Sequence, residues 1–85
     1  MAETAIVEFV NNKTRKNIEL EIPLSITANE LIIALNHAFG LGMDIDNIFD
    51  CYLVADRPMA FLKGNKKLKD FNIRNGSLII YKGND

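Results

Sequence analysis

The sequence predicts an α+β domain in which one helix packs across one face of a mixed sheet of four to five strands. Three observations lead to this prediction. The first 22 residues contain two segments of alternating character separated by a polar turn, and a segment with helical spacing follows. The rest of the chain consists of short apolar segments between turn signals. The length of 85 residues, with 48% hydrophobic and 25% charged residues, is that of a single domain spanning residues 1–85.

Two strands and a connecting turn are expected at the start of the chain. Residues 4–10 alternate in the manner of a strand, and residues 17–22 place isoleucine and leucine on one face and glutamate on the other. The polar residues 11–16 between them predict a hairpin turn. Pro23 lacks an amide hydrogen and is expected to end the second strand.

A helix is expected to begin after Thr27. Thr27 and Glu30 have the spacing of a capping box, in which each side chain bonds to the backbone of the other residue. Apolar residues then recur at helical spacing as far as Phe39. Gly40 and Gly42 supply the signal for its C-terminal end.

The second part of the chain contains three further strand candidates. Residues 49–55 are expected to form the third strand, residues 59–62 a short return strand and residues 78–81 the last strand. Between the last two, residues 68–77 are expected to form a compact loop with buried apolar side chains. The side chains expected in the core between helix and sheet are Val7, Phe9, Ile18, Leu20, Ile22, Leu31, Leu35, Cys51, Leu53, Leu68, Ile73, Leu78 and Ile80.

The chain offers few residues for catalysis or metal binding. Its single cysteine, Cys51, and single histidine, His37, form neither a catalytic triad nor a metal-ligand cluster with their neighbours. Asp44, Asp46 and Asp50 lack the central glycine and the terminal glutamate of a calcium loop. We therefore expect no enzymatic activity, no cofactor and no metal site. Cys51 is expected to be a small buried side chain, and His37 a solvated or capping residue late in the helix.

Charge and apolar patterning favour a cytoplasmic protein. The net charge of −1 gives no overall attraction to nucleic acid or to an anionic membrane. No basic segment precedes an apolar run at the N-terminus, and no run approaches the roughly 20 residues of a membrane-spanning helix. A lone cysteine fits a reducing compartment. We expect neither membrane insertion nor a small-molecule substrate.

The basic residues are concentrated in the second part of the chain. Residues 1–56 carry three basic and nine acidic side chains, and residues 57–85 carry seven basic and two acidic ones. A solvated surface is the preferred interpretation of the lysine-rich loop, because aromatic side chains do not alternate with its lysines. Nucleic acid is therefore not the expected partner, although a nucleic-acid-binding regulator that uses this loop is kept as an alternative. The lysines of the loop are Lys63, Lys66, Lys67 and Lys69.

Two parts of the chain resemble ubiquitin. One is the helix start at Thr27 and Glu30, and the other is a late segment in which ubiquitin-like domains read Leu-x-Asp-Tyr-Asn-Ile. Here Phe71 stands in place of the tyrosine, and the other positions of that segment are Leu68, Asp70, Asn72 and Ile73. The order of the elements agrees as well, so the resemblance covers most of the chain. It implies a ubiquitin-like β-grasp fold.

The end of the chain differs from that of ubiquitin. Residues 81–85 read Tyr-Lys-Gly-Asn-Asp, and no Gly-Gly pair occurs anywhere in the sequence. Ubiquitin conjugation and sulfur transfer by similar small carriers both use a terminal Gly-Gly. The resemblance therefore implies a ubiquitin fold without conjugation chemistry. A degenerate ubiquitin or sulfur-carrier-like protein is the remaining alternative.

Among ubiquitin-like domains without this tail, the sequence resembles the YukD/EsaB family. These proteins are small cytosolic components of type VII secretion systems in Gram-positive bacteria. The similarity lies in residues 29–35, which read Asn-Glu-Leu-Ile-Ile-Ala-Leu, and in the ending Leu-x-Asp-Phe-x-Ile-x-Asn-Gly-Ser-Leu over residues 68–78. It implies a non-enzymatic accessory or regulatory component whose partners are secretion-system proteins.

The face of the sheet opposite the helix is the expected binding surface. Glu8 and Asp50 are expected to face water, and Leu78 is expected to face the core. Alternation along each strand from these residues places six apolar side chains on this face. In a ubiquitin-like sheet the first, last and third strands are neighbours, so these side chains would form one patch that binds a partner protein or a second copy of the chain. Ile33 on the helix marks a weaker candidate surface. The six predicted binding residues are Ile6, Val10, Tyr52, Val54, Ile79 and Tyr81.

Overall fold

The computed structural model describes residues 3–82. Gly83, Asn84 and Asp85, on which part of the expectation about conjugation depends, lie outside the described residues. Along the chain the elements are β1 (Thr4–Asn11), β2 (Lys16–Pro23), α1 (Ala28–Phe39), the 3₁₀ helix η1 (Ile45–Asp50), β3 (Leu53–Asp56), β4 (Ala60–Leu62), the 3₁₀ helix η2 (Leu68–Phe71) and β5 (Leu78–Tyr81).

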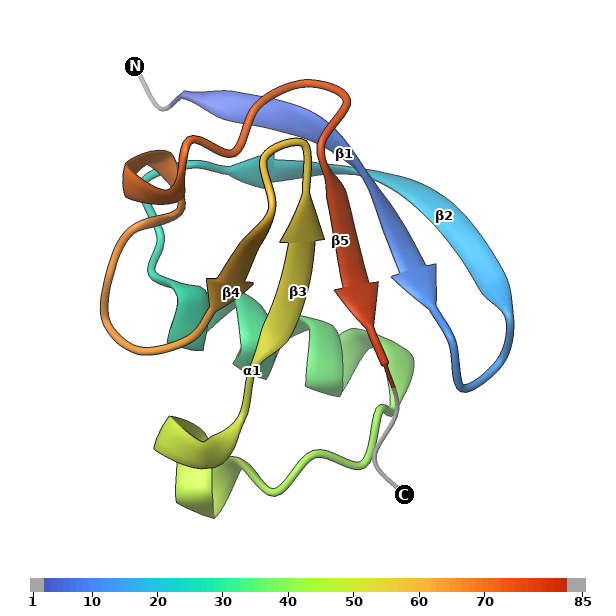
Figure 1. The fold of residues 1–85 in the computed structure, drawn as a ribbon. Coiled ribbons are helices and arrows are strands. Elements are labelled where there is room, and N and C mark those ends of the chain that lie inside the picture. Colours follow the sequence, from blue (N-terminus) through green and yellow to red (C-terminus); the bar gives the residue numbers. More distant parts are fainter. Residues whose placement is uncertain (1–2, 83–85) are drawn as a thin grey trace.

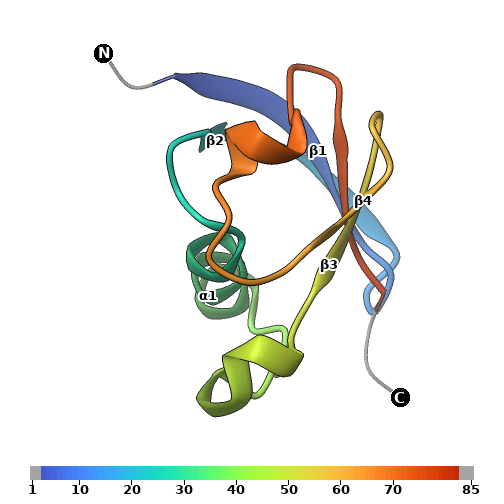
Figure 2. The same ribbon diagram turned by 60° about the vertical axis from the view of Figure 1, so that its left-hand side comes forward.

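All five strands belong to one mixed sheet with the order β2-β1-β5-β3-β4. β1 and β5 are parallel, and the other neighbouring pairs are antiparallel. α1 lies across one face of this sheet, and no helix formed by the described residues lies on the opposite face (Figure 1; Figure 2). The predicted fold class, one helix across a mixed sheet, is confirmed.

The expected capping box begins α1. The Thr27 hydroxyl accepts a hydrogen bond from the backbone N–H of Glu30 at 3.1 Å, and the Glu30 carboxylate accepts one from the backbone N–H of Thr27 at 2.9 Å. These two bonds satisfy amides that have no partner within the helix. Gly40 ends the helix in the left-handed conformation, with φ of 60°, as glycine at this position usually does.

The core lies between the inner face of the sheet and α1. β1 shows the expected alternation, since Ala5, Val7 and Phe9 are buried while the residues between them are exposed. The helix contributes its own buried stripe, and the segment after β4 contributes Leu68 and Ile73 as predicted. Burial of each large side chain of this kind stabilises the fold by roughly 1.5 to 3 kcal/mol before entropy is subtracted.

The predicted third strand begins too early. Residues 49 and 50 belong to η1, and β3 begins at Leu53. Asp44 explains the difference, because its side chain accepts hydrogen bonds from the backbone N–H of Asp46 at 3.2 Å and from the side-chain amide of Asn47 at 2.7 Å. Such local bonds favour a helical turn over an extended strand. Cys51 follows η1 and is buried, as expected.

The predicted facing of β5 is wrong. Ile79 and Tyr81, expected on the face opposite the helix, are 1% and 4% exposed. Leu78 and Ile80, expected in the core, are only half-buried and lie on that opposite face. Every residue of this strand is apolar or aromatic, so its sequence has no alternation from which to infer a face. Pairing with β1 decides the matter, because Leu78 lies beside the exposed Glu8.

One predicted core residue lies at the surface. Ile18 is 46% exposed, although its neighbours in the same alternation, Leu20 and Ile22, are half-buried and buried. β2 is the terminal strand of the sheet, and Ile18 lines an open groove together with Phe39, the last residue of α1. The alternation of β2 therefore predicts the correct face for Ile18. It does not predict how deeply a side chain on that face is buried.

Candidate functional site

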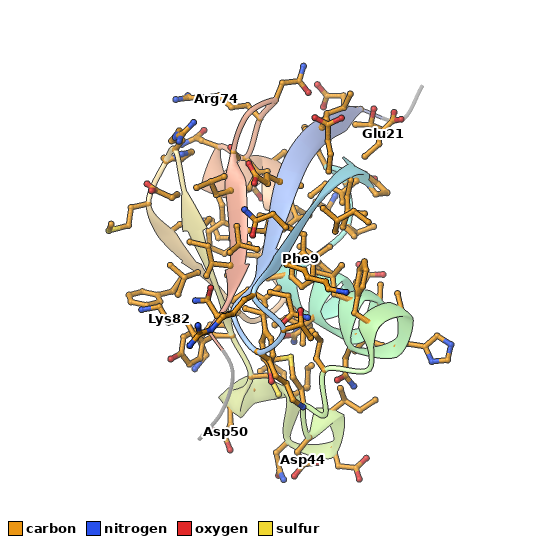
Figure 3. All side chains as sticks on the ribbon, turned by 90° about the vertical axis from the view of Figure 1, so that its right-hand side faces the viewer. Phe9, Glu21, Asp44, Asp50, Arg74 and Lys82 are labelled. Carbon is orange, nitrogen blue, oxygen red and sulfur yellow. The ribbon has the colours of Figure 1, made fainter. Side chains whose placement is uncertain are left out.

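The face of the sheet opposite α1, called the open face from here on, carries the side chains that alternate with core residues. Its apolar members come from all strands except β2. Figure 3 shows the two sides of the sheet, with α1 on one and Lys82 on the other. The apolar residues of the open face are Ile6, Val10, Val54, Phe61, Leu78 and Ile80, with Tyr52 beside them at the entrance to β3.

Four of these side chains lie in one row across adjacent strands. Val10 of β1 pairs with Ile80 of β5, Ile80 pairs with Val54 of β3, and Val54 pairs with Phe61 of β4. Directly opposed residues of neighbouring strands point to the same face and lie roughly 4.5 to 5.5 Å apart. These four residues, called the central row, therefore form a continuous apolar strip across the open face.

An aromatic pair extends the central row at β4. The rings of Tyr52 and Phe61 meet edge to face, with centroids 5.9 Å apart and an angle of 74° between their planes. Tyr52 is 44% exposed and Phe61 is 68% exposed. The two rings support one another while most of the Phe61 surface is accessible to a partner.

The structure places the six predicted binding residues on two different sides of the sheet. Ile6, Val10, Tyr52 and Val54 lie on or beside the open face, and Ile79 and Tyr81 lie in the core. Leu78 and Ile80 take the positions on β5 that were assigned to Ile79 and Tyr81. Partner binding by the four residues on or beside the open face stays a prediction.

Phe61 was not predicted as a binding residue. It belongs to a three-residue strand, and a segment that short shows no recognisable alternation. Its exposed position follows from pairing with Val54.

Acidic side chains border the central row. In the next row of the open face, Glu8 of β1 pairs with Glu19 of β2. On its other side Glu8 pairs with Leu78 of β5, and Leu78 pairs in turn with Asp56 of β3. Glu8 accepts a hydrogen bond from the side-chain amide of Asn17 at 2.8 Å. Since that donor is neutral, the negative charge of Glu8 is not compensated by this bond.

A small cavity lies between η1 and the end of β5. Its volume is about 200 Å³, and Asp44, Asp50, Cys51, Tyr52 and Lys82 are among the residues around it. The Cys51 thiol donates a hydrogen bond to the carbonyl oxygen of Asp44 at 3.4 Å. Burial, and then the negative charges of Asp44 and Asp50, raise the pKa of the thiol. A thiol in these surroundings stays protonated and is a poor nucleophile.

Within residues 3–82, no group of three or more His, Cys, Asp or Glu side chains could hold a metal ion. No helix in the same range is long and apolar enough to span a membrane.

The lysine-rich loop between β4 and η2 is exposed. The ammonium group of Lys66 lies 4.8 Å from the centre of the Phe71 ring, a cation–π contact within the protein. Phe71 is half-buried against the core. This ring is therefore engaged by Lys66 and by the core, and it offers little free surface for stacking a nucleobase.

This chain is similar to known proteins in its structure. No family model matches the chain, and no curated protein matches it by sequence. Solved structures do match. The ubiquitin-like domain of Tubulin-binding Cofactor B superposes with a TM-score of 0.72 and 25% identity, covering 94% of this chain and 89% of that one.

The fold is ubiquitin-like. The C-terminal ubiquitin-like domain of mouse tubulin-specific chaperone e, with a TM-score of 0.71, is 16% identical and covers 99% of this chain and 92% of that chain. A further match is the ubiquitin-like domain of the type VII secretion system protein ECCD1 of Mycobacterium tuberculosis. Its TM-score is 0.56 and its identity 18%, with 92% of this chain and 96% of that chain covered. The β-grasp expectation is confirmed by these matches.

Proposed function

We propose that this protein is a non-enzymatic ubiquitin-like binding module that docks its open face onto a partner protein. The observation that carries the proposal is the central row, because it places apolar side chains from four adjacent strands in one uncovered strip. A contiguous apolar surface of this kind is typical of an interaction site. Tyr52 and Phe61 are the expected anchors, since exposed aromatic side chains gain most from burial at an interface.

We further propose that the partner belongs to a bacterial type VII secretion system and that the module acts in the cytosol as an accessory or regulatory component. Two observations support this. Residues 29–35 and 68–78 resemble the YukD/EsaB family. The fold is also shared with a ubiquitin-like domain of ECCD1, a protein of such a system.

A tubulin partner is the second candidate. It is favoured by one observation, the two matches with TM-scores of 0.72 and 0.71 to domains of Tubulin-binding Cofactor B and tubulin-specific chaperone e. Both candidates use protein binding, so one set of variants serves to test them.

The decisive variant is Tyr52→Ser/Phe61→Ser. It removes the aromatic pair, and both side chains are exposed enough for the core to be retained. Ile33→Ser is the matched control, because Ile33 is 42% exposed on α1 and its replacement removes apolar surface from a different face. Thermal unfolding of both variants checks that each folds cooperatively.

Binding is measured with tagged protein in a Gram-positive bacterial lysate and, separately, with purified αβ-tubulin. We expect the wild type and Ile33→Ser to capture the secretion ATPase or membrane components, and the double variant to lose them. Capture of tubulin with the same dependence on the aromatic pair would favour the second candidate. Equal capture of any partner by the double variant and the control would show that the open face is not the docking surface.

A further inference from the structure

Among residues 3–82, nothing pairs with the backbone hydrogen-bonding groups along the outer edge of β2. The backbone N–H of Leu24 donates to the carbonyl of Glu3 at 2.9 Å, and this pair continues the register of β1 and β2. In an antiparallel ladder the residues bonded to the neighbouring strand alternate with residues whose N–H and C=O point away from it. It follows that the N–H and C=O groups of Asn17, Glu19 and Glu21 point out of the sheet, because β2 is its terminal strand.

Pro23 closes this edge at one end. It lies two residues beyond Glu21, at a position whose amide would also point outwards, and proline has no amide hydrogen to donate. The hairpin turn after Asn11 closes the other end. The free edge is thus a defined stretch of β2 with an extended backbone, long enough to pair with a short strand.

On the side of the sheet that faces α1, the edge borders an apolar groove. The groove has a volume of about 330 Å³, and Phe9, Ile18 and Phe39 are among the residues that line it. The centroids of the Phe9 and Phe39 rings are 5.1 Å apart, so the two lining rings contact each other. Ile18 is 46% exposed and Phe39 is 36% exposed, so apolar side chains of another segment could enter and be buried there.

On the open-face side, the same edge is acidic. Glu19 and Glu21 point to this side and are exposed, and Glu8 lies directly beside Glu19. The hydrogen-bond donor to Glu21 is the hydroxyl of Thr4, at 2.7 Å, which is neutral and leaves the charge uncompensated. Two carboxylates opposed on neighbouring strands repel each other and are relieved by a cation placed between them.

These three features point to one kind of partner. We propose that the edge of β2 binds an extended segment of a partner protein in which basic and apolar residues alternate. The segment would pair with the outward backbone groups of β2 as an added strand. Its basic side chains would then meet Glu19 and Glu21, and its apolar side chains would enter the groove beside Ile18, because successive side chains of a strand point to opposite faces.

A second copy of β2 fits this edge poorly. Two β2 strands side by side would bring Glu19 and Glu21 of both copies together on one face, and charged edge strands of this type disfavour self-pairing. The acidic character of the edge thus favours a basic segment of another protein. The site is separate from the central row, so the inference does not depend on the proposed function.

The probe is an acetylated and amidated peptide of four Lys-Val repeats. Its binding is followed by chemical-shift changes in the backbone amides of the ¹⁵N-labelled protein and by fluorescence anisotropy at low and high salt. We expect the largest shifts at Asn17, Glu19 and Glu21, and an affinity that falls with salt. A Glu-Val peptide of the same length, and a Lys-Val peptide methylated on the backbone nitrogens that would pair with β2, should bind at least about tenfold more weakly.

Variants of the protein test each half of the site. Ile18→Ser should weaken binding of the Lys-Val peptide about tenfold through lost apolar contact. Glu19→Lys/Glu21→Lys should reverse the preference, so that the Glu-Val peptide binds more tightly than the Lys-Val peptide. Met59→Ser is the control and should leave the affinity unchanged, because Met59 is 81% exposed in the turn between β3 and β4, at the opposite edge of the sheet from β2.

Several outcomes would overturn the proposal. They are no binding of the Lys-Val peptide at millimolar concentration, equal affinity for the acidic peptide, equal affinity for the methylated peptide, or shifts confined to β3 and β5. Preserved charge preference in the charge-reversal variant would also contradict it, since the acidic side of the edge would then have no part in recognition.

Discussion

The hydroxyl group of Tyr81 donates a hydrogen bond to the backbone carbonyl oxygen of Leu41, with 2.9 Å between the two oxygens. The residues are 4% and 1% exposed. This bond joins the end of β5 to the segment that follows α1, and it satisfies both polar groups inside the core. A tyrosine can therefore occupy an inward position that would otherwise leave its hydroxyl without a partner.

Replacement of Tyr81 by phenylalanine should destabilise the fold. The ring is kept, but the carbonyl of Leu41 loses its donor, so we expect the free energy of unfolding to fall by about 1 to 2 kcal/mol. Urea denaturation measures this change. Tyr52→Phe is the matched control, and because the Tyr52 hydroxyl is on an exposed ring its removal should change stability by less than about 0.5 kcal/mol. Equal effects of the two variants would contradict the role given to the buried bond.

The facing of β5 predicts opposite outcomes for two adjacent isoleucines. Ile79 is 1% exposed, so Ile79→Ala should lower the free energy of unfolding by about 2 to 5 kcal/mol. Ile80 is only half-buried on the open face, and Ile80→Ala should cost about 1 kcal/mol or less. Chemical denaturation of both variants gives the comparison. A larger decrease in the free energy of unfolding for Ile80→Ala than for Ile79→Ala would contradict this facing and support the one predicted from the sequence.

Ionisation of Cys51 should couple stability to alkaline pH. Burial and the charges of Asp44 and Asp50 raise the pKa of the folded-state thiol, whereas the unfolded chain ionises at the ordinary value of about 8.5. The unfolded state therefore loses its proton first, and the contribution of Cys51 to stability is complete below the ordinary pKa and is lost as pH rises through the raised one. We therefore expect the free energy of unfolding, measured by urea denaturation across this pH range, to fall more for the wild type than for Cys51→Ala.

The same thiol should react slowly with iodoacetamide at neutral pH in the folded protein. Reaction at the rate of a free cysteine would show that the thiol is neither buried nor protonated as described. Addition of denaturant serves as the control, because unfolding should restore the ordinary rate.

Loss of the capping box should weaken the start of α1. Thr27→Ala leaves the backbone N–H of Glu30 without its acceptor, and we expect a cost of about 1 kcal/mol in the free energy of unfolding. Thr14→Ala in the exposed hairpin turn is the control and should change stability by less than about 0.5 kcal/mol. If the two substitutions cost the same, the cap does not contribute as the geometry indicates.

Local features of the structure could be predicted from the sequence. The hairpin, the beginning of α1 at Thr27, its end at Gly40 and the inward face of β1 all depend on residues close to one another in the chain, so capping residues and alternation are sufficient to predict them. The order of these elements, together with the resemblance of two segments to ubiquitin, indicated a ubiquitin-like fold, and the solved structures confirm that fold.

The binding surfaces depended on contacts between distant residues. β5 consists of Leu78, Ile79, Ile80 and Tyr81, and its facing was decided by pairing with β1 and by the bond from Tyr81 to Leu41. The exposure of Ile18 was decided by how far α1 covers the sheet.

The sequence by itself therefore determined where the hairpin, α1 and the last strand form, because those preferences are local. Only the tertiary structure decided which apolar side chains are left for a partner, because burial depends on what packs against each face.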